Sequence, residues 1–475
     1  MKFTPAEPQR LMIERQIKDL LFFGCVGMGI GKTAASLYAF NELYNGMETH
    51  GALVIAPLRV VNLTWPMEIA QWDQFKWMRV ANLRTQLGRR AFIAGAAHIY
   101  LINYESIPLL AKLVEKRGGE LPYDTIIYDE STKMKNPSAK RINLLRNEVP
   151  KVPRRWALTG TPAPNSLLDL FAQVRMLDDG ERLGRSYDHF KKTYFHATDY
   201  QQYNWVANAG TQETIEQRIS DITLVLRTSD WLKDVPDAVV EDVEITMPAK
   251  LMDQYREFEE ELILELRQEV QITAANAAAL VTKLLQFTSG AVYDGEKVAH
   301  HVHDLKMNAL KKIVKESKTP VLVAVNFKHE QDRIRKEFPQ ARFFADAKTE
   351  SMQVQLLTQW NRREIPVLVA HPKSCGHGLN MQMGSSLIVY YSLTYSREAY
   401  EQMIARLVRR GQKEPVTIMR LMCPGTVDDA IATVLESKRD TETRLLSALM
   451  MLESAKSLKV PVVKEVAPDE DEWLN

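Results

Sequence analysis

The feature that most constrains the fold of this chain is a glycine-rich turn between an apolar run and a helical pattern. Residues 20–23 form the apolar run, and Gly27, Gly29 and Gly31 follow it immediately before Lys32 and Thr33. Glycines without Cβ atoms let backbone amides converge on phosphate oxygens, and a helix N-terminus adds positive potential there. The order strand, glycine-rich turn, helix predicts an α/β fold with a parallel sheet.

The two residues that close this turn have the chemistry of a nucleotide site. Lys32 supplies a positive charge for β- and γ-phosphates, and Thr33 supplies a hydroxyl ligand for Mg²⁺. The strict P-loop pattern has glycine at the position of Val26, so the turn taken alone also fits a glycine-rich connection without a ligand. The remainder of the site therefore has to come from elsewhere in the chain.

A second signal is a pair of adjacent carboxylates after another apolar run. Residues 125–128 read as a buried strand, and Asp129 and Glu130 come directly after it. Parallel sheets bind ligands at the carboxyl ends of their strands. Asp129 is suited to the Mg²⁺ shell, and Glu130 is suited to orient or deprotonate an attacking water. In isolation such a pair is usually a solvated turn, but together with Lys32 and Thr33 it predicts an ATP site.

Two further segments complete the expected site. Thr159, Gly160 and Thr161 follow the predicted strand 156–158, where hydroxyls could sense the γ-phosphate or simply cap a turn. Gln402, Arg406 and Arg409 are spaced by four and three residues, which predicts one face of a helix. Arginines there could reach the γ-phosphate as arginine fingers, whereas an arbitrary arginine-rich helix more often has a solvated basic face.

The alternation of apolar runs with helical patterns along the chain predicts two α/β lobes joined by helices. The chain has 475 residues, which is long for a single core. Apolar runs alternate with helix-compatible segments in both halves, whereas residues 252–270 and 274–287 read as amphipathic helices. The predicted strands, besides 20–23, 125–128 and 156–158, are 52–56, 98–102, 321–325, 342–344, 367–370, 387–391 and 416–421. Residues 428–458 have a helical pattern, and the acidic end of the chain predicts disorder.

Composition narrows the class of protein only a little. The net charge is +1, so overall charge neither favours nor excludes a nucleic-acid partner. The three cysteines lie far apart, which argues against a zinc site or a disulfide framework and fits a reducing compartment. No apolar run has signal-peptide or membrane-spanning character. We therefore expect a soluble cytoplasmic protein with no membrane partner, in a bacterial cell or in the host cytoplasm of a bacteriophage.

Taken in order, these motifs resemble those of the Swi/Snf-type DNA-dependent ATPases of helicase superfamily two, in the compact form found in bacteria and bacteriophages. The resemblance covers nearly the whole chain. Two departures stand out: Val26 and Gly27 replace an acidic pair, and Thr132 replaces the usual histidine after Asp129 and Glu130. The segments that match the family motifs contain Gln9, Met28 to Thr33, Pro57, Asp129, Glu130, Thr159 to Pro162, Ser374, Gly378, Asn380, Gln402, Arg406 and Arg409.

The resemblance implies a fold and a set of roles. It implies two RecA-like lobes in tandem with a helical insertion, predicted as residues 1–235, 236–305 and 306–458, before an acidic tail at 459–475. It implies ATP and Mg²⁺ as cofactors, with Lys32, Asp129, Glu130, Arg406 and Arg409 catalytic. The other residues that it assigns to ATP are Gln9, Met28, Gly29, Ile30, Gly31, Thr33, Gly378 and Gln402. The residues that it assigns to nucleic acid or to coupling are Pro57, Thr159, Gly160, Thr161, Ser374 and Asn380.

The function implied by this resemblance is ATP-driven translocation on duplex DNA, with backbone contacts and little sequence specificity. We expect a monomer that relies on a partner protein for targeting. Two alternatives stay open at this point. One is an RNA or single-strand helicase, and the other is a nucleotide-gated clamp with slow turnover, which the Thr132 departure keeps open.

Overall fold

The computed structural model describes residues 2–146, 152–160, 162–163, 166–198, 205–231, 235–268, 274–375, 379–409 and 411–436. Two compact units make up these residues. The first contains the described parts of Met1–Glu241, Lys312–Tyr390 and Glu398–Met419. The second contains the described parts of Asp242–Lys311, Tyr391–Arg397 and Arg420–Asn475.

A seven-stranded sheet is the framework of the N-terminal lobe, which lies in the first unit. Its strand order is β3-β4-β2-β5-β6-β1-β9, and neighbouring strands pair in parallel. The strands are β1 (Leu21–Val26), β2 (Ala52–Ala56), β3 (Val80–Asn82), β4 (Ile99–Asn103), β5 (Thr125–Asp129), β6 (Arg154–Thr159) and β9 (Thr223–Leu226). Because every pair is parallel, the carboxyl ends of these strands lie along one edge of the sheet.

Helices bury both faces of this sheet. Within β1, Phe22 and Val26 pack into one apolar cluster, whereas Phe23 and Cys25 pack into the other, as the two-residue period of a strand requires. Burial on both sides explains why the strands read as continuous apolar runs. The first cluster includes residues of α1 (Glu7–Lys18), α2 (Lys32–Asn45), η1 (Val60–Thr64) and α3 (Trp65–Gln71). The second includes residues of α4 (Gln86–Ala94), α5 (Ile107–Lys116), α6 (Lys140–Arg146), α7 (Leu170–Asp178), α8 (Tyr187–Tyr194) and α9 (Thr211–Ile219).

A six-stranded sheet is the framework of the C-terminal lobe. Its order is β10-β17-β16-β13-β15-β14, and β13 pairs in parallel with both β15 and β16. Its strands are β10 (Val239–Glu244), β13 (Val321–Ala324), β14 (Arg342–Phe343), β15 (Val367–Ala370), β16 (Leu387–Tyr390) and β17 (Thr417–Met422). The helices between them are α13 (Leu305–Glu316), α14 (Lys328–Glu337), α15 (Glu350–Asn361) and α16 (Arg397–Ile404). Two parallel-sheet lobes of the RecA-like kind confirm the predicted fold class.

The predicted strands all occur, and their ends differ from the predicted ends by at most three residues. The strands of two short hairpins were not predicted, namely β7 (Phe195–Ala197) with β8 (Trp205–Ala207), and residues 291–293 with 299–301. In the two large sheets three strands were missed: β3, β9 and β10. Each of them lies at an edge of its sheet, where one side of the strand has no neighbour to bury it. The sequence of β10, Val-Val-Glu-Asp-Val-Glu, is almost wholly exposed and lacks the apolar run of a central strand. The segment expected to be a helical insertion therefore begins with a strand of the second sheet.

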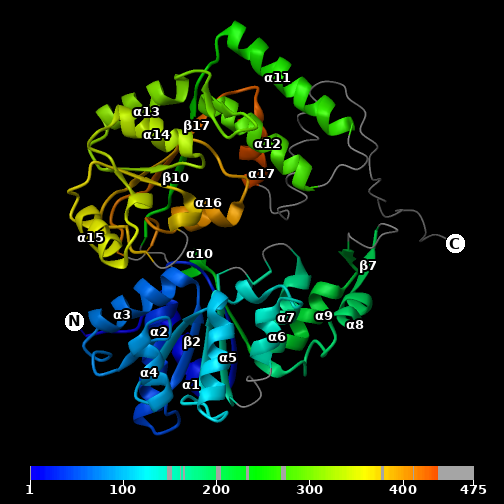
Figure 1. Cartoon of the computed structure of the whole chain (residues 1–475), viewed down its shortest axis with the longest axis vertical. Coiled ribbons are helices and arrows are strands. Elements are labelled where there is room, and N and C mark those ends of the chain that lie inside the picture. Colours follow the sequence, from blue (N-terminus) through cyan, green and yellow to red (C-terminus); the bar gives the residue numbers. More distant parts are fainter. Residues whose placement is uncertain are drawn as a thin grey trace, which may run out of the picture. The chain divides into compact units, whose positions relative to one another are not determined.

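The second unit contains the two expected helices, α11 (Ala249–Gln268) and α12 (Ala274–Ser289). Figure 1 shows α12 beside α17 (Val427–Glu436), so segments far apart in sequence meet there. A short hairpin, β11 (Ala291–Tyr293) with β12 (Ala299–His301), follows α12. The predicted C-terminal helix 428–458 is observed as far as Glu436, and its remainder and the acidic tail lie outside the described residues. Among the described helices, none is both long enough and apolar enough to cross a membrane.

Candidate active site

Four neighbouring strands deliver the predicted residues to one edge of the first sheet. Strands β2, β5, β6 and β1 are consecutive in the sheet order. Pro57 follows β2, Asp129 ends β5, Thr159 ends β6, and the glycine-rich turn follows β1. The sequence could place these residues together because parallel strands present their carboxyl ends at the same edge.

The glycine-rich turn has the backbone shape of a phosphate-binding loop. Gly29 and Gly31 have φ values of 83° and 89°, in the left-handed region that favours glycine. Gly31 is the residue before α2, and a Cβ atom there would lie 2.4 Å from the Gln9 side-chain nitrogen. Lys32 Nζ donates to the Val26 carbonyl oxygen at 2.9 Å, which holds the ammonium group at the turn.

Gln9 supports this turn from α1. Its Nε2 donates to the Ile30 carbonyl oxygen at 2.9 Å, and its Oε1 accepts from the Ala6 amide at 2.8 Å. The side chain is buried. Gln9 therefore fixes the glycine-rich turn in the described structure, and its expected contact with ATP stays a prediction.

Thr228 is a neighbour of the turn that sequence patterns did not reveal. It begins α10 (Thr228–Trp231), and its hydroxyl donates to the Met28 carbonyl oxygen at 3.0 Å. A Cβ atom on Gly27 would lie 2.2 Å from that hydroxyl oxygen and 2.8 Å from the Thr228 backbone nitrogen. The close approach explains why glycine stands at position 27 where the family has an acidic residue. The two residues are about 200 positions apart, so only the fold brings them together.

Asp129 is a buried carboxylate with few donors. Trp65 Nε1 donates to Asp129 Oδ2 at 3.0 Å, and the Tyr104 hydroxyl donates to the Asp129 carbonyl oxygen at 2.9 Å. Burial, together with the neighbouring Glu130 carboxylate, raises the pKa of Asp129 to about 6, although Lys32 and the Trp65 N–H oppose this rise. A buried anion that is stabilised so incompletely is suited to receive a cation.

The residue after Asp129 has an unusual backbone. Glu130 has a φ of 55° and a ψ of 58°, in the left-handed region that non-glycine residues rarely adopt. Such strain is typical of functional turns, where surrounding contacts must maintain it. The turn continues into η3 (Ser131–Met134), whose first residue is fully buried.

The two arginines do not lie on the helix that their spacing predicted. Helix α16 ends at Ile404, and Arg406 and Arg409 lie in the turns that follow it. Arg406 Nε donates to the Gln402 carbonyl oxygen at 2.9 Å, which takes the acceptor that the Arg406 amide would use in a continuing helix. The Arg406 amide instead bonds Met403 O. The expectation of a single helical face carrying all three residues was therefore wrong.

These turns nevertheless hold the arginines firmly. Arg409 Nη1 donates to the Leu379 carbonyl oxygen at 2.9 Å, and Arg406 is buried. Burial and the adjacent Arg406 lower the pKa of Arg409 to about 10, and Glu68 opposes this shift. Arg409 therefore stays charged at neutral pH. The segment returns to the sheet through Gln412, whose Nε2 bonds the carbonyl oxygens of Gln382 and Ser385 at 3.0 Å each.

One pocket of the first unit brings these groups together. Lys32, Asp129 and Glu130 contribute to its wall, and so do Arg406 and Arg409. The other predicted residues that line it are Met28, Gly29, Gly31, Thr33 and Asn380. Asn380, which the resemblance assigned to nucleic acid or coupling, thus lies in the wall of the pocket. Residues of the wall that were not predicted are Val60, Thr64, Glu68 and Ala405.

The remaining predicted residues that the structure describes lie outside this wall. Ile30 and Thr159 are buried, the former within the glycine-rich turn and the latter at the end of β6. Gln402 is buried on α16, and its Nε2 bonds Glu398 Oε1 at 2.8 Å. Pro57 lies in the turn after β2, Gly160 lies next to the Met28 and Lys32 side chains, and Ser374 lies in η7 (Pro372–Cys375). Thr161 and Gly378 lie outside the described residues.

Comparison with known proteins identifies the family to which this chain belongs. The family described as "SNF2-related domain" matches residues 23–353, and the "Helicase conserved C-terminal domain" matches residues 305–411. The chain belongs to the SNF2-related family. The predicted resemblance to Swi/Snf-type ATPases is therefore confirmed, and the chain is an ATP hydrolase of the helicase type.

Relatives of this SNF2-related chain differ greatly in length. "Putative protein p41" of Acyrthosiphon pisum secondary endosymbiont phage 1 is 37% identical over 94% of this chain and 99% of its own length. An "uncharacterized ATP-dependent helicase" of Mycoplasma pneumoniae is 22% identical over 88% of this chain but only 39% of its own length. The "DNA repair and recombination protein RAD54-like" of Gallus gallus is 23% identical over 90% of this chain and 64% of that protein. The chain thus spans almost all of the phage relative and a part of the others.

Proposed function

We propose that this SNF2-related chain is a DNA-dependent ATPase that couples ATP hydrolysis to translocation along duplex DNA, with little sequence specificity. The observation that carries the proposal is the distribution of charge around the pocket. Lys32, Arg406 and Arg409 supply positive charge for a triphosphate, and Asp129 and Glu130 supply the carboxylates that its hydrolysis requires. The name of the Gallus gallus relative, a DNA repair and recombination protein, supports DNA as the partner.

The residues of the pocket fit a Mg²⁺ ion. Thr33 and Asp129 both line it, and among the described residues no lysine or arginine forms an ion pair with Asp129. Mg²⁺ in nucleotide enzymes is usually held by one or two protein oxygens together with phosphate oxygens, so a cluster of carboxylates is not required. Bound there, Mg²⁺ would neutralise charge on the β- and γ-phosphate oxygens.

The protein groups then have separate tasks in hydrolysis. Lys32 exchanges the Val26 carbonyl oxygen for phosphate oxygens, because a phosphate anion is a stronger partner for an ammonium group than a carbonyl. Glu130 orients the attacking water and accepts its proton. Arg406 and Arg409 stabilise the charge that develops on the γ-phosphate. Loss of that phosphate weakens the contact of the arginines with the nucleotide, and we propose that this change drives the step along DNA.

The proposal is tested by steady-state ATP turnover with duplex DNA, single-stranded DNA and RNA at low salt. We expect duplex DNA to stimulate turnover most, and no strand separation of a tailed duplex. Arg409→Ala should retain ATP binding but lose turnover by roughly 10³-fold, as expected for an arginine finger. Absence of stimulation by duplex DNA would contradict the proposal. Stimulation by RNA or single strands alone would favour a helicase, and tight ATP binding without turnover would favour a clamp.

A further inference from the structure

Gln173 has a fully buried amide whose polar atoms are all engaged. It lies on α7, and its Oε1 accepts from the Ser131 hydroxyl at 2.6 Å. Its Nε2 donates to the Pro162 carbonyl oxygen at 2.7 Å and to the Asp169 carbonyl oxygen at 2.8 Å. A primary amide has two N–H donors, so both of them are used.

This amide joins two turns at the edge of the first sheet. Ser131 directly follows Glu130, in the turn that carries the catalytic carboxylates. Pro162 belongs to the turn that follows Thr159 and Gly160. The turns leave neighbouring strands, β5 and β6, which pair from Thr125 to Asp129. Gln173 is therefore a side-chain bridge between the two turns.

Burial makes this bridge sensitive to small movements. If either turn shifts enough to break its bond, the fully buried amide of Gln173 loses a partner, which is far more costly than losing an exposed bond. The backbone of Glu130 is in the left-handed region and needs support from its surroundings. The turns can change position at low cost only if they change together.

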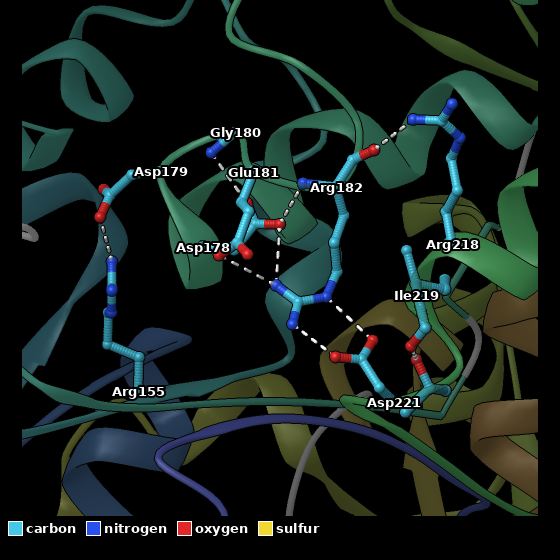
Figure 2. A network of polar contacts seen from close by, with 10 residues as sticks. Arg155, Asp178, Asp179, Gly180, Glu181, Arg182, Arg218, Ile219 and Asp221 are labelled. Atoms are coloured by element: carbon cyan, nitrogen blue, oxygen red, sulfur yellow. Dashed lines mark hydrogen bonds and ion pairs between the residues drawn. The ribbon is translucent and has the colours of Figure 1, made fainter.

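The helix that carries Gln173 is anchored at its far end. Figure 2 shows the polar network after α7, in which Arg155 on β6 pairs with Asp179 at 3.0 Å. The buried Asp178 accepts from the amides of Gly180 and Arg182 at 2.8 and 2.9 Å. Arg182 also forms a two-bond pair with Asp221, at 2.9 and 2.5 Å. These contacts fix the end of α7 to the sheet, so the helix holds Gln173 in place between the two turns.

We infer that Gln173 is a positioning residue that makes the Glu130 turn and the Thr159–Gly160 turn respond together to nucleotide. In the proposed function, the same bridge carries that response toward bound DNA. The joint response of the two turns concerns the protein and ATP alone, and only the effect on DNA rests on the proposed function.

The joint response of the two turns to nucleotide is tested by hydrogen exchange of the full chain in the absence of nucleic acid. Exchange is compared with and without Mg²⁺ and a non-hydrolysable ATP analogue. In the wild type, the peptides that contain Glu130 and Gly160 should both become more protected. In Gln173→Met, which keeps the length of the side chain but not its amide, only the Glu130 peptide should respond. Equal responses of both peptides in this variant, or no response of the Gly160 peptide in the wild type, would overturn the inference.

A matched control and a second variant separate this role from general stability. Gln16 and Ser36 form another fully buried Gln–Ser pair, at 2.9 Å, with no bond to either turn. Gln16→Met should therefore keep both responses, and loss of the Gly160 response in that variant would show a merely structural effect. Ser131→Ala cuts the same bridge from its other end with a smaller change. If Gln173→Met does not fold, Ser131→Ala tests the inference in its place. An unchanged Gly160 response in Ser131→Ala would also overturn the inference.

The role of the Gln173 bridge in the response to DNA is tested by the ratio of duplex-stimulated to unstimulated ATP turnover. This ratio should fall about tenfold in Gln173→Met and in Ser131→Ala, which is within the usual range of coupling between sites. The double variant should be no worse than the more impaired single variant, because both changes break one bridge. A wild type without duplex stimulation would contradict the proposed function and leave the exchange result intact. A Gln173→Met protein with the full ratio would overturn the coupling role alone.

Discussion

Two buried aspartates, one in each compact unit, show how burial of a carboxylate can serve opposite ends. Asp129 in the first unit receives the Trp65 indole N–H and lies beside a second carboxylate, so burial raises its pKa to about 6. Asp428 in the second unit faces the ammonium group of Lys306 at 2.7 Å, and both side chains are 0% exposed. Asp428 also accepts from Thr288 Oγ1 at 3.1 Å and from the Cys423 amide at 3.0 Å.

The difference lies in how completely the charge is compensated. The oxygens of Asp428 have a cation and two further donors, so this group serves to join α17 to α12 and α13. No lysine or arginine among the described residues forms an ion pair with Asp129, and the charge of Lys32 offsets its burial only in part, which leaves Asp129 suited to a metal ion and a nucleotide. A buried carboxylate that is poorly compensated marks a functional site, and a well compensated one marks a structural joint.

The largest expected effect would separate activity from stability at Asp129. Asp129→Asn should lower ATP turnover by roughly 10³-fold or more, because the anionic oxygen for the metal ion is lost. The same change removes a buried charge, so the free energy of unfolding should be unchanged or higher by about 1 kcal/mol. Turnover assays and urea unfolding of the same preparation measure both quantities. A strongly destabilised Asp129→Asn protein would break the comparison.

At Asp428 we expect the reverse, a large loss of stability with a small loss of turnover. Asp428→Asn leaves Lys306 buried without its counter-charge, which should cost about 3 kcal/mol of stability. Turnover per folded molecule should fall far less than in Asp129→Asn. Urea unfolding gives the first quantity, and turnover corrected for the folded fraction gives the second.

Two controls sharpen this prediction. The double variant Lys306→Met with Asp428→Asn removes both charges and should recover much of the lost stability. Asp73 and Lys76 form an exposed pair at 2.5 Å, and Asp73→Asn should change the free energy of unfolding far less than Asp428→Asn does. Equal costs for the exposed and buried pairs would show that burial of the Lys306 charge is not the cause.

The smallest effect concerns the donor to Asp129. Trp65→Phe keeps an aromatic ring but removes the indole N–H bond, and turnover should fall about tenfold, since a bond to a charged group contributes about 1.5–3 kcal/mol. Trp156 is an equally buried control on β6, and its indole nitrogen has no hydrogen-bond partner among the described residues. Trp156→Phe should leave turnover within about twofold. Similar turnover in the two variants would mean that the Trp65 bond does not position Asp129.

Much of the fold could be predicted because the signals are local. Buried parallel strands have apolar runs along the chain, so the central strands of both large sheets were found, whereas their edge strands β3, β9 and β10 and the two short hairpins were missed. The end of α16 was also missed. The spacing of Gln402, Arg406 and Arg409 continues a helical pattern beyond its last residue. The bond from Arg406 to the Gln402 carbonyl oxygen and the anchoring of Gln412 nevertheless end the helix.

By itself the sequence determined the chemistry of the site. The glycine-rich turn with Lys32, the pair Asp129 and Glu130, and the arginines Arg406 and Arg409 are short patterns whose meaning depends on neighbouring residues and on strand ends. Only the tertiary structure decided which distant groups support them: Thr228 behind the turn, Trp65 on Asp129, and Gln173 between two turns. A hydrogen bond between residues tens or hundreds of positions apart leaves no periodic trace along a chain, because the folding of intervening segments sets which side chains meet.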